Sequence, residues 1–195
     1  MEPYVYTEGS FPLELKLLQD GIQFDHSRAV SKISGQLAKQ LGYLPDEIAI
    51  IEQVALYHDL GKMFINPKLL NKPGPLTPDE FAIVKKHTEI GYAKLIELIK
   101  ILNLAAVVAS THHEKIDGTG YAGLHGPDIH PYSRIISVVD VYEALRATRA
   151  YKKSWPLEKV LAYMKEGAGT QFDADVVKAL MEAVGAEVER GDYAQ

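Results

Sequence analysis

Residues 45–62, PDEIAIIEQVALYHDLGK, carry the pattern that decides the fold. Pro45 and the two acidic residues after it are typical of a helix N-terminus, and apolar residues then recur every three or four positions. That spacing is the period of an α-helix with one buried face, and His58 falls on the same face. The segment therefore predicts a helix that ends near Gly61 and carries His58 and its neighbour Asp59 toward the interior.

The same helical period recurs along the rest of the chain, and no segment shows the sustained alternation of a β-strand. Apolar stripes predict further helices over about 26–41, 78–95, 101–111, 133–147, 156–166 and 174–188. Segments rich in proline, glycine or polar residues separate them, most clearly at 66–75 and 114–130. We therefore expect an all-α, single-domain helical bundle of roughly seven helices.

The chain of 195 residues is long enough for one domain with a sizeable core. We expect that domain to span 21–188, with an N-terminal segment at 1–20, to which the pattern assigns no role, and a C-terminal tail at 189–195. No apolar run is long enough to cross a membrane and the N-terminus lacks a signal-peptide pattern, so we expect a cytoplasmic protein without membrane insertion. The absence of cysteine excludes disulfides and thiolate chemistry, and a net charge of -5 argues against a nucleic-acid polymer as partner.

Histidines and aspartates stand where helical spacing calls for apolar core residues. His26, His58 and His87 lie on the apolar stripes of three different helices, and Asp140 lies in the middle of a fourth, strongly apolar one. A lone inward histidine is most often a hydrogen-bonded core residue, but so many together are hard to explain one at a time. We predict one shared site for divalent metal ions, since imidazole and carboxylate are their usual ligands. Its predicted members are His26, His58, Asp59, His87, His112, His113 and Asp140.

Several motifs, taken in order, resemble one known family over nearly the whole chain, from about His26 to Val177. They are YHDLGK at 57–62, NKPG at 71–74, HHEKIDGTGYAGLHG at 112–126, RIISVVDVY at 134–142 and RAYKK at 149–153. The His-Asp pair alone is a weak signal, but the ordered series resembles the HD-GYP subfamily of the HD metal-dependent phosphohydrolases. The resemblance implies that the predicted bundle has the HD phosphohydrolase fold.

The resemblance also implies roles for individual residues. It assigns His26, His58, Asp59 and Asp140 to a first metal ion and His87, His112 and His113 to a second, with Asp59 bridging both. Iron and manganese are the expected metals. Lys62 corresponds to a position near the scissile phosphate, so Asp59 and Lys62 are the expected catalytic residues. Tyr121, Arg149 and Lys152 correspond to positions that contact the phosphate backbone of the substrate.

The activity that the resemblance implies is hydrolysis of cyclic di-GMP to linear pGpG, and in some relatives on to GMP, in bacterial second-messenger signalling. Two ions about 3.5–4 Å apart suit this reaction, because they activate water at neutral pH and stabilise charge on the phosphoryl oxygens. The expected partners are the cyclic dinucleotide and an upstream sensor or receiver domain, or a diguanylate cyclase. Two alternatives stay open: a metal-dependent hydrolase of another nucleotide or phosphoester, and a non-catalytic signalling module that binds metal or nucleotide and a partner protein.

Three positions depart from the family pattern. Ala122 replaces the proline of Gly-Tyr-Pro, so the loop loses a fixed φ and we expect it to be more mobile, which admits a different substrate. Ile22 stands where some members carry a glutamate that recruits a third metal, so we expect two ions. After the His-Asp motif, the family's usual Gly before Ile-Pro is replaced, and this chain reads Phe64-Ile65-Asn66-Pro67. His125 and His130 fall outside the pattern, and we expect both to be solvated loop residues.

Overall fold

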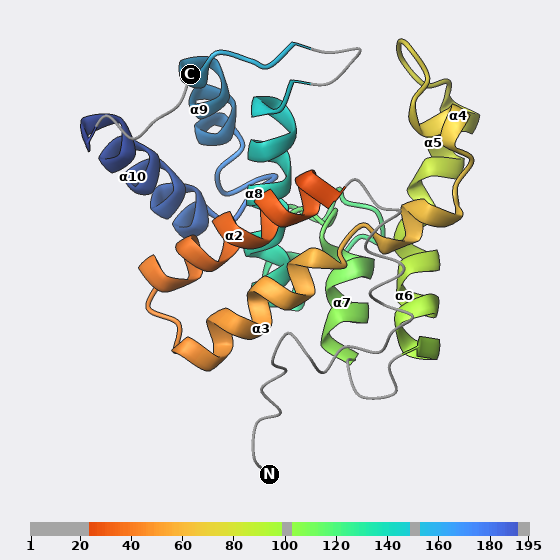
Figure 1. Cartoon of the computed structure of the whole chain (residues 1–195), viewed down its shortest axis with the longest axis horizontal. Helices are drawn as coiled ribbons and strands as arrows, with labels where there is room; N and C mark the ends of the chain where they lie inside the picture. The colour runs from red at the N-terminus through yellow and green to blue at the C-terminus, as the bar shows by residue number, and fades with distance from the viewer. Residues whose placement is uncertain (1–23, 99–102, 149–152, 191–195) are drawn as a thin grey trace.

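The computed structural model describes residues 24–98, 103–148 and 153–190. In these ranges the chain is helical, without a β-strand, and two isolated β-bridges are its only extended pairings (Figure 1). The helices are α2 (Phe24–Gln40), α3 (Pro45–Leu56), α4 (Pro67–Leu70), α5 (Pro78–Lys85), α6 (His87–Leu98), α7 (Asn103–Thr111), α8 (Pro131–Arg146), α9 (Leu157–Glu166) and α10 (Ala174–Arg190), with 3-10 segments η1 (Leu60–Phe64) and η2 (Gly126–Asp128). The predicted all-α class is confirmed.

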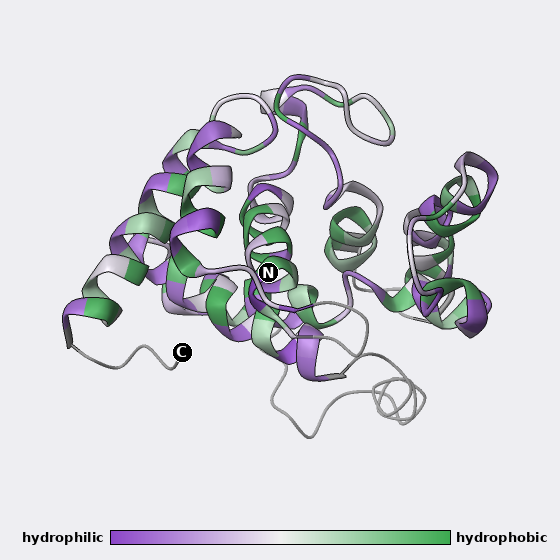
Figure 2. Cartoon of the chain, turned by 90° about the horizontal axis from the view of Figure 1, so that it is seen from above, coloured by the Kyte–Doolittle hydropathy of each residue, from purple (hydrophilic) through white to green (hydrophobic). Residues whose placement is uncertain are grey.

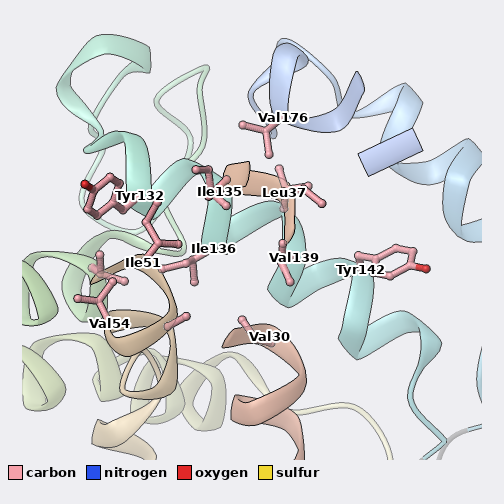
Figure 3. Packing of buried hydrophobic residues seen from close by; sticks show 14 of the residues in the cluster. Val30, Leu37, Ile51, Val54, Tyr132, Ile135, Ile136, Val139, Tyr142 and Val176 are labelled. Atoms are coloured by element: carbon pink, nitrogen blue, oxygen red, sulfur yellow. The ribbon is translucent and has the colours of Figure 1, made fainter. Parts of the chain in front are cut away.

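Helix α8 lies at the centre of the bundle and packs against α2, α7, α9 and α10. It is buried on most of its surface, which is typical of a helix surrounded by others. Figure 3 shows its Ile135, Ile136 and Val139 in the core, together with side chains from α2, α3 and α10. The outer helices alternate in hydropathy around their axes, as expected for helices with one buried face (Figure 2). Among the described residues, no helix has the length and apolar character needed to cross a bilayer.

Two predicted helix boundaries were wrong, both near the predicted site. The helix expected to end near Gly61 ends at Leu56, and the 3-10 segment η1 follows after a short turn. The helix expected over 78–95 is interrupted at Lys86, where the chain tightens because the N–H of Lys86 donates to the carbonyl of Ile83. This interruption separates α5 from α6. Together with the one-turn helix α4, it explains why the described residues hold more helices than predicted.

The predicted capping box opens α5: the side chain of Thr77 accepts from the N–H of Glu80, and the Glu80 carboxylate accepts from the N–H of Thr77.

His125 and His130 were both expected to be solvated loop residues. His125 is exposed, as expected. His130 is only half-buried but is not a simple loop residue, because its Nδ1 accepts from the N–H of Tyr132 and caps α8.

Gly61 marks the point where η1 touches α6. A β-carbon at this position would lie 1.8 Å from the carbonyl oxygen of His87 and 2.7 Å from the nitrogen of Gly91. Both are backbone atoms, which cannot rotate aside as a flexible side chain can. Only glycine therefore allows this close approach, which brings the segment after α3 against the first turn of α6.

We expect Gly61→Ala to lower the free energy of unfolding by about 1–3 kcal/mol or more, because it overpacks a backbone contact. Urea unfolding followed by circular dichroism measures the effect. The matched control is Gly185→Ala in α10, where a β-carbon would meet nothing within 4 Å. Helix propensity favours alanine there by about 1 kcal/mol. An equal loss of stability in both variants would contradict the close-packing argument.

Candidate metal centre

The structure brings together all seven residues predicted as metal ligands. They form two groups, each with one ligand atom per residue within 4.8 Å of the others: His26, His58, Asp59 and Asp140 in the first, and Asp59, His87, His112 and His113 in the second. They come from α2, the turn after α3, the start of α6, the end of α7 and the middle of α8. His113 is half-buried and the others are buried, so several helices enclose a polar centre inside an apolar bundle.

Asp59 belongs to both groups, and its two carboxylate oxygens face different histidines. Oδ1 lies 3.3 Å from Nε2 of His87 and 3.6 Å from Nε2 of His112. Oδ2 lies 3.4 Å from Nε2 of His58 and 3.8 Å from Nε2 of His26. A carboxylate has two oxygens with which to bind two cations, whereas an imidazole with its proton on one nitrogen has a single lone pair. The geometry of Asp59 is therefore that of a residue able to bridge two ions.

Backbone carbonyls fix the orientation of three imidazoles. In each, Nδ1 donates to the carbonyl of the residue three positions earlier: His58 to Ala55 at 2.6 Å, His87 to Val84 at 2.7 Å and His112 to Ala109 at 3.0 Å. The proton on Nδ1 leaves Nε2 with its lone pair directed into the centre.

These inward-facing atoms test whether the centre fits a cation. Within the described part of the chain, Nε2 of His58, His87 and His112 and Oδ1 of Asp59 are buried without a hydrogen-bond partner. Leaving several acceptors unpaired in a protein interior is costly, and such groups are rare in native structures. A divalent cation in each group would satisfy all of them, so the donor set fits metal ions.

Glu143 is a residue of the centre that was not predicted from the sequence. Its Oε2 bonds with Nδ1 of His26, whose Nε2 lies 3.1 Å from Oδ1 of Asp140. A carboxylate behind a ligand histidine fixes the tautomer and strengthens the ligand. The spacing of three between Asp140 and Glu143 places both on one face of α8, and this spacing is the signal that would have revealed it.

The charges of the centre stabilise one another against their burial. Burial alone would lower the pKa of His58, but Asp59 and Asp140 outweigh it and raise this pKa to about 10. Burial alone would raise the pKa of Asp59, yet Lys62 and His58 hold it well below its usual value. Burial lowers the pKa of His113 well below its usual value. The two carboxylates thus remain ionised and His113 remains neutral, which are the forms that bind cations, whereas His58 must release the proton on Nε2 before that nitrogen can bind one.

Lys62 lies at the rim of this centre. Its ammonium donates to Oδ2 of Asp59, and 27% of its side chain is exposed. The sequence predicted Lys62 near the scissile phosphate, and the structure adds a partner that was not predicted. The lysine therefore has one side toward the ligand group and another toward solvent.

Tyr121 is the predicted substrate contact that the structure describes. Its ring centroid lies 4.9 Å from that of His113 and 6.1 Å from that of Phe81. Nζ of Lys85 lies 4.7 Å from the centroid of the Tyr121 ring. The ring thus stands between the proposed second metal group and α5. Three further positions named in the sequence analysis, Ile22, Arg149 and Lys152, lie outside the described residues.

Comparison with known sequences shows where such a centre occurs. Residues 15–176 match the model of the HD domain family. The chain is 41% identical over 154 residues to the cyclic di-GMP phosphodiesterase response regulator RpfG of Xanthomonas campestris, covering 78% of this chain and 41% of that protein. It is 40% identical over 168 residues to the cyclic di-GMP phosphodiesterase PA4108 of Pseudomonas aeruginosa, covering 85% and 40%. It is 36% identical over 160 residues to the 3'3'-cGAMP-specific phosphodiesterase 3 of Vibrio cholerae, covering 82% and 35%. The chain thus spans about two-fifths of these relatives or less.

Two solved structures share the fold. An HDG"Y"P protein of Bdellovibrio bacteriovorus, Bd1817, superposes with a TM-score of 0.69 at 22% identity, over 82% of this chain and 51% of that one. The HD domain of the Listeria monocytogenes phosphodiesterase PgpH superposes with a TM-score of 0.67 at 20% identity, over 93% and 97%. At these identities the likeness concerns the fold alone. Because the family match covers residues 15–176 and relatives at 41% and 40% identity are named as cyclic di-GMP phosphodiesterases, the chain belongs to the HD domain family, in the HD-GYP branch.

Proposed function

We propose that this domain is a metal-dependent phosphodiesterase that hydrolyses cyclic di-GMP to linear pGpG. The observation that carries the proposal is the position of Asp59, whose two oxygens face two histidine groups with unpartnered, buried nitrogens. The relatives named as cyclic di-GMP phosphodiesterases, at 41% and 40% identity, support the choice of substrate. Further hydrolysis to GMP stays a prediction.

The proposed cofactors are two divalent ions, iron or manganese, held by the seven ligands of the two groups. Mixed nitrogen and oxygen donors suit first-row divalent metals, and the absence of cysteine removes the thiolates that favour zinc or copper(I). When bound, adjacent ions supply activated water at neutral pH and stabilise negative charge on the phosphoryl oxygens. Two rather than three ions are proposed, because Ile22 has no side-chain donor for a third.

The side chains of the domain would divide the remaining work. Asp59 stays ionised and would hold the two ions close together. Lys62, at the rim, would exchange its contact with Asp59 for an oxygen of the scissile phosphate and stabilise the charge that develops there. Tyr121, beside His113, would form a wall against the rest of the substrate, and Arg149 and Lys152 would contact its phosphates.

A second substrate is favoured by a specific observation. Relatives at 36% and 35% identity are named as 3'3'-cGAMP-specific phosphodiesterases, so a mixed cyclic dinucleotide is the alternative that fits the same centre. The proposed protein partner is an upstream sensor or receiver domain or a diguanylate cyclase, and the name of one relative, a response regulator, supports a receiver. The cytoplasmic location predicted from the sequence stays a prediction.

The experiment that tests the function combines metal counting with turnover. Protein purified under anaerobic conditions should contain two ions per chain and convert cyclic di-GMP to pGpG with iron or manganese, faster than it converts 3'3'-cGAMP. Removal of the ions by a chelator should stop the reaction, and adding either metal back should restore it. Protein that holds two ions identified as iron or manganese and binds cyclic di-GMP without hydrolysing it would refute the enzymatic proposal and favour the signalling module.

A further inference from the structure

Glu114 directly follows the two histidines of the second metal group but does not belong to that group. It is almost completely buried, with 3% of its surface exposed. Its Oε1 accepts from the N–H of Ala122 at 2.6 Å, and its Oε2 accepts from the N–H of Leu124 at 2.9 Å. Hydrogen bonds to a carboxylate are about twice as strong as those between neutral groups. One buried side chain therefore ties down the far part of the glycine-rich loop.

The residue before Tyr121 also lies against Glu114. A β-carbon on Gly120 would lie 2.6 Å from Cα of Glu114 and 2.7 Å from the nitrogen of Lys115. Gly120 is thus in close backbone contact with Glu114, and Ala122 is hydrogen-bonded to it. Both neighbours of Tyr121 thus lie against Glu114, Gly120 by backbone packing and Ala122 through a hydrogen bond, so the backbone at Tyr121 is supported from two sides.

The bond from Ala122 depends on the one position where this loop departs from the family motif. A proline there would have no N–H to donate to Oε1 of Glu114. From the sequence alone, the replacement of proline by alanine means only the loss of a fixed φ. The structure shows that alanine also provides a donor, and that a buried carboxylate accepts from it.

We propose that Glu114 is a positioning residue, which holds the ring of Tyr121 against His113 through the N–H of residue 122. Tyr121 lies 4.9 Å from His113, centroid to centroid, so its place is tied to the metal centre. A wall that is already in place costs less entropy to order when substrate binds. The proposal rests on the proposed function, because Tyr121 is taken to contact the cyclic dinucleotide.

The first test is Glu114→Gln, which keeps the size of the side chain but turns one acceptor into a donor that faces a backbone N–H. The KM for cyclic di-GMP should rise about tenfold while kcat and metal content stay unchanged, because binding is weakened and the ligands are not touched. The matched control is Asp117→Asn, since Asp117 is exposed and its carboxylate accepts from Thr119 within the same loop. Its KM should stay within about twofold of the wild type, as expected for a surface substitution.

The second test asks whether the N–H of residue 122 is the link. Ala122→Pro removes the N–H, whereas Ala122→Ser keeps it on the same exposed position. Ala122→Pro should raise KM about tenfold and Ala122→Ser should not. Because proline also restricts φ, Ala122→Pro is combined with Glu114→Gln. The fold increase in KM of the double variant should be at least about fivefold smaller than the product of the two single fold increases, as for residues that share one interaction.

Three results would overturn the proposal. The first is a rise in KM on Ala122→Pro that is equally large in the wild type and in the Glu114→Gln variant, since backbone strain would then explain it. The second is loss of metal from Glu114→Gln, which would make Glu114 a support of the ligands. The third is an unchanged KM in Glu114→Gln. If the wild type hydrolyses neither cyclic dinucleotide, the proposed function fails, and the same cycle measured by urea unfolding still tests the bond between residues 114 and 122.

Discussion

Asp59→Asn is expected to release one or both metal ions and to abolish nearly all hydrolysis of cyclic di-GMP. Asparagine keeps the volume of the side chain but removes the charge and replaces one of two acceptor oxygens by an NH₂ group. In the structure each oxygen faces a different histidine group, so neither can be lost without unpairing one ion. Turnover should fall by at least about a thousandfold, the scale on which loss of an essential catalytic group acts.

Metal content by mass spectrometry and product formation by chromatography measure this effect on the same sample. Asp128→Asn is the matched control, because Asp128 is an exposed aspartate in η2 and belongs to neither ligand group. It should retain both ions and wild-type turnover. If Asp59→Asn kept two ions at full occupancy and normal turnover, the bridging role of Asp59 would be wrong.

Lys62→Ala has the second largest expected effect, and it should separate catalysis from metal binding. Removing one preorganised donor to a developing anion lowers kcat by roughly 10²–10³. Both ions should remain, because they replace the positive charge that Lys62 otherwise provides to Asp59. The protein should also remain folded, since the lysine lies at the rim of the centre and not in its interior.

Single-turnover rates at saturating substrate, together with the metal content of the same sample, test this expectation. Lys68→Ala removes the same charge from an exposed position in α4 and should leave kcat unchanged. Loss of metal in Lys62→Ala would show that the lysine supports the ligand group through Asp59. Its proposed contact with the scissile phosphate would then have to be abandoned.

The clustering of the candidate ligands could be predicted from the sequence because four of the seven break a simple rule. His26, His58, His87 and Asp140 occupy apolar stripes, and residues that violate a buried pattern stand out in a single sequence. Glu143 and Glu114 did not stand out, for different reasons. Glu143 lies in the last turn of α8, where a glutamate breaks no buried pattern, and only its spacing of three from Asp140 marks it. Glu114 acts on residues eight and ten positions later, and no local pattern encodes the path of a loop.

Gly61 shows why helix ends were harder to predict than the site. A glycine after an apolar stripe indicates a helix stop, and a glycine is equally required where two backbones touch. The sequence does not distinguish these two uses, and here the second applies. The interruption at Lys86 has no glycine or proline to mark it. The need for glycine at position 61 depends on the packing of η1 against α6, a tertiary contact, and the interruption lies directly before His87, whose carbonyl Gly61 approaches.

The inward-facing imidazole nitrogens of the centre make its metal content depend on how the protein is prepared. For nitrogen and oxygen ligands, affinity rises from manganese through iron, cobalt and nickel to copper, and falls again at zinc. A centre with five histidines should therefore bind nickel from an affinity column, or zinc from a growth medium, more tightly than manganese. An inactive sample with two ions per chain is then a mismetallated one until the ions are identified. The same nitrogen and oxygen donors that suit iron or manganese would also bind nickel, copper or zinc more tightly, so the ligand set alone does not select the metal.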